Sequence, residues 1–232
     1  MAGGGVQLVG TAPCDTIGLF IANLDEELRR SMKIDDKYRA IGLIGSRTGA
    51  GAQIKAVDDA IKAASADVIS IELPRDTKGW GGHGNFIVLG GENAADVKKA
   101  VELSLENIRH TVGEIYISKA GHMECHFSAR SDAAVNKAFG IPNGRPFGFV
   151  CVSPAPIGLA ASDAAAKSGS IEIVRLLRPS EGTSHSNEVI MVFTGEVSAV
   201  ESAVINGKRT GLELLEAMGS EAVPSGEPYI KV

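Results

Sequence analysis

The chain has 232 residues, of which 44% are hydrophobic and 5% aromatic, and its formal net charge is −5 with a pI near 5.6. This length suits one large domain or two of about 100 residues each, and the apolar content excludes a disordered chain. The acidic balance lacks the basic footprint of nucleic-acid binding.

We also expect no export signal and no membrane association. The first residues lack the basic and apolar regions of a secretory signal, and no apolar run approaches the roughly 20 residues that span a bilayer. The three cysteines, Cys14, Cys125 and Cys151, show no paired spacing, which favours free thiols in a reducing cytosol.

In chain order, the first predicted element is a short helix, because Leu24, Leu28 and Met32 recur at every fourth position. The apolar run 39–46 predicts a buried strand, and the glycines within 48–51 indicate a tight turn into a helix. The apolar stripe of that helix has 3-4-3 spacing and consists of Ile54, Val57, Ile61 and Ala64.

Two further strands and a helix complete this unit. Residues 68–73 are rich in β-branched side chains, which favour a strand, and 85–90 form another apolar run. Asn93 is placed to cap a last helix, whose apolar stripe consists of Val97, Val101, Leu105 and Ile108. Strands and helices alternate, so we expect a sheet with helices packed on it.

The second half of the chain repeats this pattern. Residues 41–74 align with 147–179, and 86–101 align with 190–204. The identities that survive in the first pair are Gly42 with Gly148, Asp58 with Asp163, Ala60 with Ala165, Lys62 with Lys167 and Pro74 with Pro179.

A weaker match joins 21–32 to 128–139 through Ala22 with Ala129 and Asp25 with Asp132. Because internal repeats at a fixed order indicate duplicated units, we predict two tandem copies of one domain. Their predicted bounds are 13–113 and 114–219.

A glycine-rich segment, "DTKGWGGHG", separates two predicted strands in the first copy. It lacks both GxxxxGK[ST] and GxGxxG, and a strand rather than a helix follows it, so it does not fit a phosphate-binding loop. Its residues are Asp76, Thr77, Lys78, Gly79, Trp80, Gly81, Gly82, His83 and Gly84.

The stretch "GHMECH" contains three residue types that bind metals, namely His122, Cys125 and His126. A structural zinc site usually has four ligands in two close pairs, and no second pair occurs. In a strand, His122 and His126 would share a face and Cys125 would point to the other. Ordinary strand side chains are therefore the favoured interpretation, and no metal or cofactor is expected.

No motif for nucleophilic catalysis is present, since GxSxG is absent. His83 and His185 lie in equivalent loops, beside Asp76 and Glu181, where an acid/base pair can be imagined. The simpler interpretation is that both loops are exposed and polar. Lys62 and Lys167 are an equivalent pair near a helix end, where a lysine is usually solvated or complements the helix dipole; its presence in both copies suggests a shared surface role.

These residues together resemble the bacterial microcompartment shell proteins. The pattern G-x-I-x-x-R…A-x-D-A-x-x-K-A-A-x-V of that family is visible in 42–68 and more loosely in 148–173, and V-x-x-G-(D/E)-x-x-A-V-x-x-A-V resembles 88–101 and 192–204. Because a short helix and its strand precede each core, the chain is similar to the circularly permuted tandem-domain subclass.

The resemblance implies an α+β fold of two tandem, circularly permuted, ferredoxin-like microcompartment (BMC) domains, each a mainly antiparallel sheet with packed helices. It implies a homotrimer that forms a pseudohexagonal tile, joins other shell proteins edge to edge around encapsulated enzymes, and passes small polar metabolites through pores. It also implies a location in a microcompartment shell in the cytoplasm. Nucleic acid and membrane are not expected partners.

The resemblance further assigns residues to sites. It implies that the segment 76–84 faces a pore, together with its counterpart in the second copy, which consists of Ser180, Glu181, Gly182, Thr183, Ser184, His185 and Ser186. It maps the edge lysine of the family onto Lys62 and Lys167. Neither loop has a cysteine for an iron–sulfur cluster. A tandem-domain small-molecule sensor is the alternative function, and an enzyme is a third.

Overall fold

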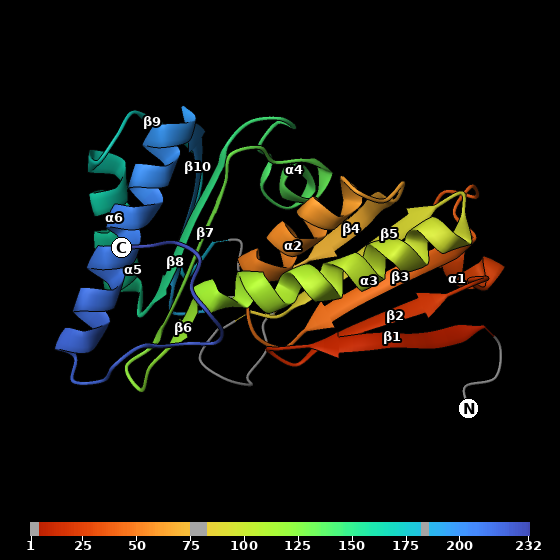
Figure 1. The fold of residues 1–232 in the computed structure, drawn as a ribbon, viewed down its shortest axis with the longest axis horizontal. Helices are drawn as coiled ribbons and strands as arrows, with labels where there is room; N and C mark the ends of the chain where they lie inside the picture. Colours follow the sequence, from red (N-terminus) through yellow and green to blue (C-terminus); the bar gives the residue numbers. More distant parts are fainter. Residues whose placement is uncertain (1–4, 75–82, 182–185) are drawn as a thin grey trace.

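The computed structural model describes residues 5–74, 83–181 and 186–232, and it contains two antiparallel sheets covered by helices (Figure 1). In the first half, β1 (Val6–Ala12), β2 (Thr16–Ile21), β3 (Ala40–Ser46), β4 (Asp67–Glu72) and β5 (Asn85–Gly91) form a sheet of order β1-β2-β3-β5-β4. Its helices are α1 (Glu26–Ser31), α2 (Gly51–Ile61) and α3 (Ala94–Thr111).

The second half repeats this order after a short 3₁₀ turn, η1 (Val112–Glu114). The strands β6 (Ile115–Ile117), β7 (His122–Ser128), β8 (Phe147–Ser153), β9 (Ile171–Leu177), β10 (Val189–Gly195) and β11 (Val223–Pro224) form a sheet of order β11-β6-β7-β8-β10-β9. Its helices are α4 (Ala133–Phe139), α5 (Ala155–Lys167) and α6 (Val197–Ala217). The predicted α+β fold with two antiparallel units is confirmed.

The sequence interpretation did not include the hairpin β1–β2 at the start of the chain. Cys14 and Asp15 form its turn with positive φ angles of 63° and 53°. Gly18 of β2 lies under α3, where an added Cβ would lie 2.7 Å from the side chain of Leu105. The close approach of helix to strand thus explains this glycine, which also weakens the strand pattern in the sequence.

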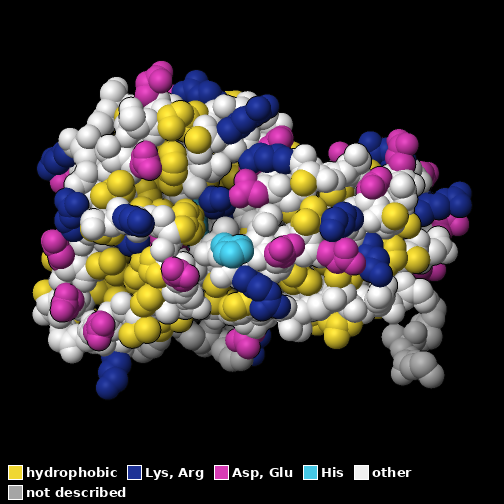
Figure 2. All heavy atoms as spheres, in the orientation of Figure 1, with side chains coloured by type: hydrophobic (Ala, Val, Ile, Leu, Met, Phe, Trp, Pro, Cys, Tyr) yellow, Lys and Arg dark blue, Asp and Glu magenta, His cyan; other side chains and the backbone are white. Residues whose placement is uncertain are grey.

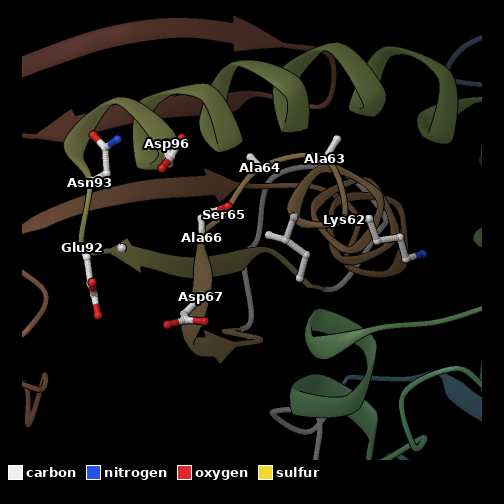
Figure 3. A pocket seen from close by; sticks show the side chains of 11 residues that line it. Lys62, Ala63, Ala64, Ser65, Ala66, Asp67, Glu92, Asn93 and Asp96 are labelled. Atoms are coloured by element: carbon white, nitrogen blue, oxygen red, sulfur yellow. The ribbon is translucent and has the colours of Figure 1, made fainter.

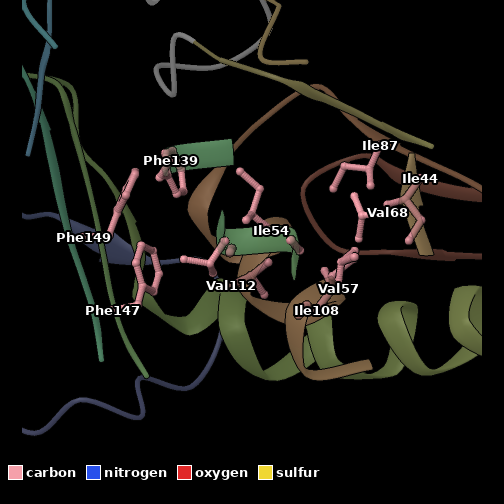
Figure 4. Close-up of a cluster of buried hydrophobic side chains, with 14 of the residues drawn as sticks. Ile44, Ile54, Val57, Val68, Ile87, Ile108, Val112, Phe139, Phe147 and Phe149 are labelled. Carbon is pink, nitrogen blue, oxygen red and sulfur yellow. The ribbon is translucent and has the colours of Figure 1, made fainter. Parts of the chain in front are cut away.

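The two halves share one hydrophobic core. Figure 4 shows Phe139, Phe147 and Phe149 from the second half facing Ile54 and its neighbours from the first. The Phe139 ring lies 5.8 Å from Phe147 and 5.5 Å from Phe149, centroid to centroid, which is a favourable range for aromatic pairs. Burial of this cluster therefore joins the halves as well as stabilising each one.

Two buried carboxylates from opposite halves also fasten this junction. Asp58 of α2 accepts hydrogen bonds from the backbone N–H groups of Asp132 (2.8 Å) and Val135 (3.0 Å) at the start of α4. Glu124 of β7 accepts from the N–H of Ala52 (2.7 Å) at the start of α2. Because the first N–H groups of a helix have no partner within it, each half caps a helix of the other.

Candidate functional site

The predicted pore loops fall largely outside the described residues. Asp76, Thr77, Lys78, Gly79, Trp80, Gly81 and Gly82 of the first loop, and Gly182, Thr183, Ser184 and His185 of the second, lie there. The described ends are His83 and Gly84 of the first loop and Ser180, Glu181 and Ser186 of the second. Glu181 pairs with Arg178 on the surface through the Arg178 Nε–Glu181 Oε2 hydrogen bond of 3.0 Å.

The two loops meet where each returns to the sheet. Ser186 Oγ donates to Glu188 Oε1 at 2.8 Å, and His83 Nδ1 contacts the same carboxylate oxygen. All three residues are buried, so the expectation that His83 belongs to an exposed loop is wrong. The carboxylate of Glu188 therefore connects His83, at the end of the first loop, to Ser186, at the end of the second loop.

Two further side chains extend this cluster into the second sheet. His122 Nε2, from β7, lies 3.1 Å from Glu188 Oε2, and Cys151 Sγ, from β8, lies 3.8 Å from His122 Nε2. Burial, followed by the charge of Glu188, raises the pKa of the Cys151 thiol well above its ordinary value. The cluster of His83, His122, Cys151, Ser186 and Glu188 is called the loop-end cluster below.

The grouping of His122, Cys125 and His126 suggested by their nearness in sequence does not exist in space. Cys125 Sγ lies on another side, 3.5 Å from Glu114 Oε2, and His126 Nε2 lies 3.0 Å from Glu124 Oε1. Only His122 belongs to the loop-end cluster. The signal that sequence reasoning missed is strand pairing, since β7 and β8 are adjacent and bring His122 beside Cys151.

Glu124 is ionised in this setting despite its burial. Desolvation alone would raise the pKa of its carboxyl group, but hydrogen bonding from His126 and from the N–H groups of Ala52 and Ala50 outweighs this and lowers the pKa. The carboxylate form is thus part of the folded structure.

The two predicted edge lysines occupy equivalent positions with different surroundings. Lys62 Nζ lies 3.1 Å from Asp58 Oδ2 and donates to the backbone carbonyl of Arg130 at 2.8 Å, and its side chain is 29% exposed. Lys167 contacts only its helix neighbour Asp163, at 2.6 Å, among the described residues, and its side chain is 74% exposed. Lys62 thus connects the first half of the chain to the second through Arg130, whereas Lys167 projects into solvent.

An open depression of about 650 Å³ adjoins Lys62 and is lined by residues from 61–67 and from the turn before α3. Figure 3 shows that Asp67 and Glu92 lie on one side and that Lys62 points away from them. The depression is polar and wide open, and it contains none of the loop-end residues.

Equivalent positions in the two halves differ sharply in exposure. Strand register aligns Gly42 with Gly148, and from this alignment four exposed apolar residues have buried counterparts. Leu28 (50% exposed) corresponds to Val135, Met32 (37%) to Phe139, Leu159 (57%) to Ile54 and Ile173 (49%) to Val68. In the folded chain, these counterparts pack α4 against α2 and β4.

The exposed residues form two separate faces. Leu28 and Met32 make up the α1 face, and Leu159, Ile173 and Leu176 make up the α5–β9 face. Figure 2 shows hydrophobic side chains gathered over the half of the molecule that contains α5 and α6. Each face corresponds to one side of the junction within the chain, and each lacks its partner among the described residues.

The antiparallel α+β unit occurs twice in the chain, which defines a tandem-domain protein whose candidate site lies at the ends of equivalent loops. The model of the BMC domain family matches residues 40–120 and 147–225. The chain is 46% identical over 224 residues to the bacterial microcompartment shell protein PduB of Citrobacter freundii, covering 97% of this chain and 83% of the relative. Its identity to the PduB of Limosilactobacillus reuteri is 42% over 217 residues, covering 94% and 91%.

Solved structures agree with these matches. A trimeric bacterial microcompartment shell protein PduB superposes with a TM-score of 0.92 at 41% identity, over 96% of this chain and 99% of that one. EtuB from Clostridium kluyveri also superposes with a TM-score of 0.92, at 38% identity over 96% and 98%. The chain therefore belongs to the BMC-domain family and is a structural shell protein of a bacterial microcompartment.

The relatives are named as shell proteins, and no catalytic family is indicated. Within the described residues, no helix has the length and apolar character required to cross a membrane. The location of the chain is the microcompartment shell, as the resemblance implied.

Proposed function

We propose that three copies of this chain form a non-enzymatic, pseudohexagonal tile in which each α1 face docks on the α5–β9 face of the next copy. The observation that carries this proposal is the correspondence between these exposed faces and the buried junction within the chain. At four positions, an exposed apolar residue corresponds to a residue that is buried in the contact between the two halves. The contact within the chain therefore serves as the model for the proposed contact between chains.

The two faces are different surfaces, so their contact is heterologous, and such contacts generate rings when the rotation closes. Each chain supplies two equivalent units, and three chains supply six. The trimeric state stated for the PduB structure supports three copies as the closing number. The proposed division at 13–113 and 114–219 gives each tile six such units.

We infer that the loops predicted at 76–84 and 180–186, apart from their buried ends His83, Gly84 and Ser186, face pores of this tile and that small polar metabolites cross there. The supporting observation is that the described ends of both loops meet at Glu188, so a ring of three chains would gather these loops in three equivalent places. Encapsulated enzymes are further proposed partners of the tile.

We assign the tile edge to Lys62 and Lys167. The exposed Lys167 is placed to reach a neighbouring tile, and Lys62 also holds the carbonyl of Arg130. In the Lys62→Ala/Lys167→Ala double variant, trimers should persist while extended sheets are lost, as seen by electron microscopy. Sheets indistinguishable from wild type would refute the edge assignment.

The test of the tile itself is sedimentation over a range of chain concentrations, followed by microscopy of concentrated samples. Trimers that grow into sheets or tubes are expected, and a stable monomer at every concentration would overturn the proposal. Calorimetry with a small diol then addresses the loops. Weak binding is expected of a pore, whereas tight, saturable binding would identify the tandem-domain sensor instead.

A further inference from the structure

We propose that His122, Cys151 and Glu188 of the loop-end cluster bind a zinc ion. One ligand atom from each residue is available, and these atoms all lie within 4.8 Å of one another. The three side chains come from β7, β8 and the segment just before β10, so strand pairing holds them together.

The two separations from His122 Nε2 are close to those of a tetrahedral site. With zinc–nitrogen and zinc–oxygen distances of about 2.0–2.1 Å and a zinc–sulfur distance of about 2.3 Å, neighbouring ligands lie about 3.3 Å (N to O) and 3.5 Å (N to S) apart. The observed values are 3.1 Å from His122 Nε2 to Glu188 Oε2 and 3.8 Å from His122 Nε2 to Cys151 Sγ. The third separation, from Cys151 Sγ to the Glu188 carboxylate, is within 4.8 Å, and zinc binding would draw these two atoms to about 3.5 Å.

The hydrogen bonding of Glu188 points to a missing ligand. Its side chain is fully buried, and Oε2 makes no hydrogen bond of regular geometry, although His122 Nε2 lies 3.1 Å from it. An unpaired buried carboxylate oxygen is costly, and it faces the ring nitrogen of His122. Nδ1 of His122 is also buried without a partner, so contacts through Nε2 alone hold this ring in the cluster.

Zinc also balances the charge of the cluster. The ion carries two positive charges, and the carboxylate of Glu188 and the thiolate of Cys151 carry one negative charge each. Binding breaks the S–H bond of Cys151, releases its proton to solvent and forms the zinc–sulfur bond. Nitrogen, sulfur and carboxylate oxygen form a donor set that suits zinc, whereas calcium and magnesium require oxygen ligands.

Metal ligands are usually held in orientation by hydrogen bonds from surrounding groups, and the other oxygen of the Glu188 carboxylate receives such contacts. Oε1 accepts a hydrogen bond from Ser186 Oγ at 2.8 Å and contacts His83 Nδ1. Three protein ligands leave one coordination position for a water molecule. The ion would fasten two strands of the second sheet to the residue that joins the ends of both loops.

The test measures zinc in the full chain, purified without chelator and dialysed against zinc, by mass spectrometry of the metal. One ion per chain is expected in wild type and in the matched control Cys125→Ser, which alters another buried cysteine of β7 outside the cluster. Cys151→Ser and Glu188→Gln should bind at least tenfold more weakly. Absence of zinc from the folded wild type, or full retention in Cys151→Ser, would overturn the proposal.

A second measurement leaves the site residues unchanged. Cobalt replaces zinc in such sites, and a thiolate ligand produces a sulfur-to-cobalt charge-transfer absorption. In the Cys14→Ser/Cys125→Ser variant, Cys151 is the only remaining cysteine, and this absorption should persist at the wild-type intensity. Its absence from the folded, cobalt-treated variant would refute Cys151 as a ligand even if Cys151→Ser failed to fold.

Discussion

The docking of the α1 face can be tested by replacing its two apolar residues with glutamine, in Leu28→Gln/Met32→Gln. Glutamine is about as good a helix former as leucine or methionine, so α1 itself should persist. In the free chain, Leu28 is 50% exposed and Met32 is 37% exposed. The residual exposed area is what the proposed contact with the α5–β9 face would bury.

The expected magnitude follows from this exposure. Full burial of a leucine or methionine side chain contributes about 1.5–3 kcal/mol, so the exposed parts of the two contribute roughly 1.7 kcal/mol to one contact. A closed trimer repeats the contact three times, which gives about 5 kcal/mol. At about 1.4 kcal/mol for each factor of ten, the association constant falls by a factor of several thousand.

Sedimentation velocity or light scattering over a dilution series measures this effect. The ratio of trimer to free chain depends on the square of the free chain concentration, so the midpoint concentration should rise by the square root of that factor, roughly 60-fold. Val197→Gln is the matched control, because Val197 is 44% exposed and its counterpart Ala94 is exposed in the folded chain. A shift below about fivefold, or an equal shift in the control, would refute the docking model.

The same reasoning predicts the opposite behaviour at the buried counterpart. Phe139→Ala should lower the free energy of unfolding of the chain by about 3–5 kcal/mol, because this ring is buried in the shared core. Met32→Ala, measured under monomeric conditions, should change it by less than about 0.5 kcal/mol. Equal losses of unfolding free energy in denaturant titrations would show that position 32 is not the exposed equivalent of position 139.

Three further outcomes are expected. Glu124→Gln should lower the free energy of unfolding by about 1–3 kcal/mol at neutral pH. Because folding lowers the pKa of Glu124 from its ordinary value of 4.5, the carboxylate stabilises the fold above about pH 4.5, and this stabilisation is lost as the pH falls. The unfolding free energy of the variant, measured over the same acid range, should lack this pH-dependent loss. Lys208→Met should cost about 3–5 kcal/mol in thermal or chemical unfolding, since it leaves the buried carboxylate of Glu114 without its 2.7 Å ion pair. Lys167→Ala should leave the unfolding free energy unchanged, whereas Lys62→Ala should lower it, because only Lys62 is tied to a second segment of the chain.

Periodicity in the sequence predicted the elements whose burial repeats regularly. The stripe of Val97, Val101 and Ile108 lies buried on α3, and the equivalence of Asp58 with Asp163 reflects a real duplication of α2 in α5. The hairpin β1–β2 was not predicted, although residues 17–22 of its second strand form a short apolar run like the one that predicted β3. Its first strand gives a weaker signal, because β1 is an edge strand that is largely exposed and shows no strict alternation.

The loop-end cluster was beyond reach of sequence reasoning for a different reason. Its residues at 83, 122, 151 and 188 are separated by about 30 to 40 positions, and no local motif links them. They meet because β7 pairs with β8 and β8 with β10, and because the first loop returns beside the second sheet. Strand register therefore determines the cluster.

The duplication has left the two junctions chemically different, which directs how chains can assemble. Inside the chain, Glu124 caps the N-terminus of α2. Strand register places Ile17, which is 42% exposed, at the equivalent position on β2. Helix α5 has less need of such a carboxylate, because Pro156 in its first turn has no N–H and the N–H of Ala155 donates to Asn187 Oδ1. The contact between the two halves of one chain can contain buried charges, because folding fixes the partners of these charges. The proposed contact between chains instead offers exposed apolar area, whose burial is the main driving force for association. Because α2 is already capped by Glu124 of the same chain, the proposed docking model closes the trimer through the α1 and α5–β9 faces and leaves the lysine edge for contacts between tiles.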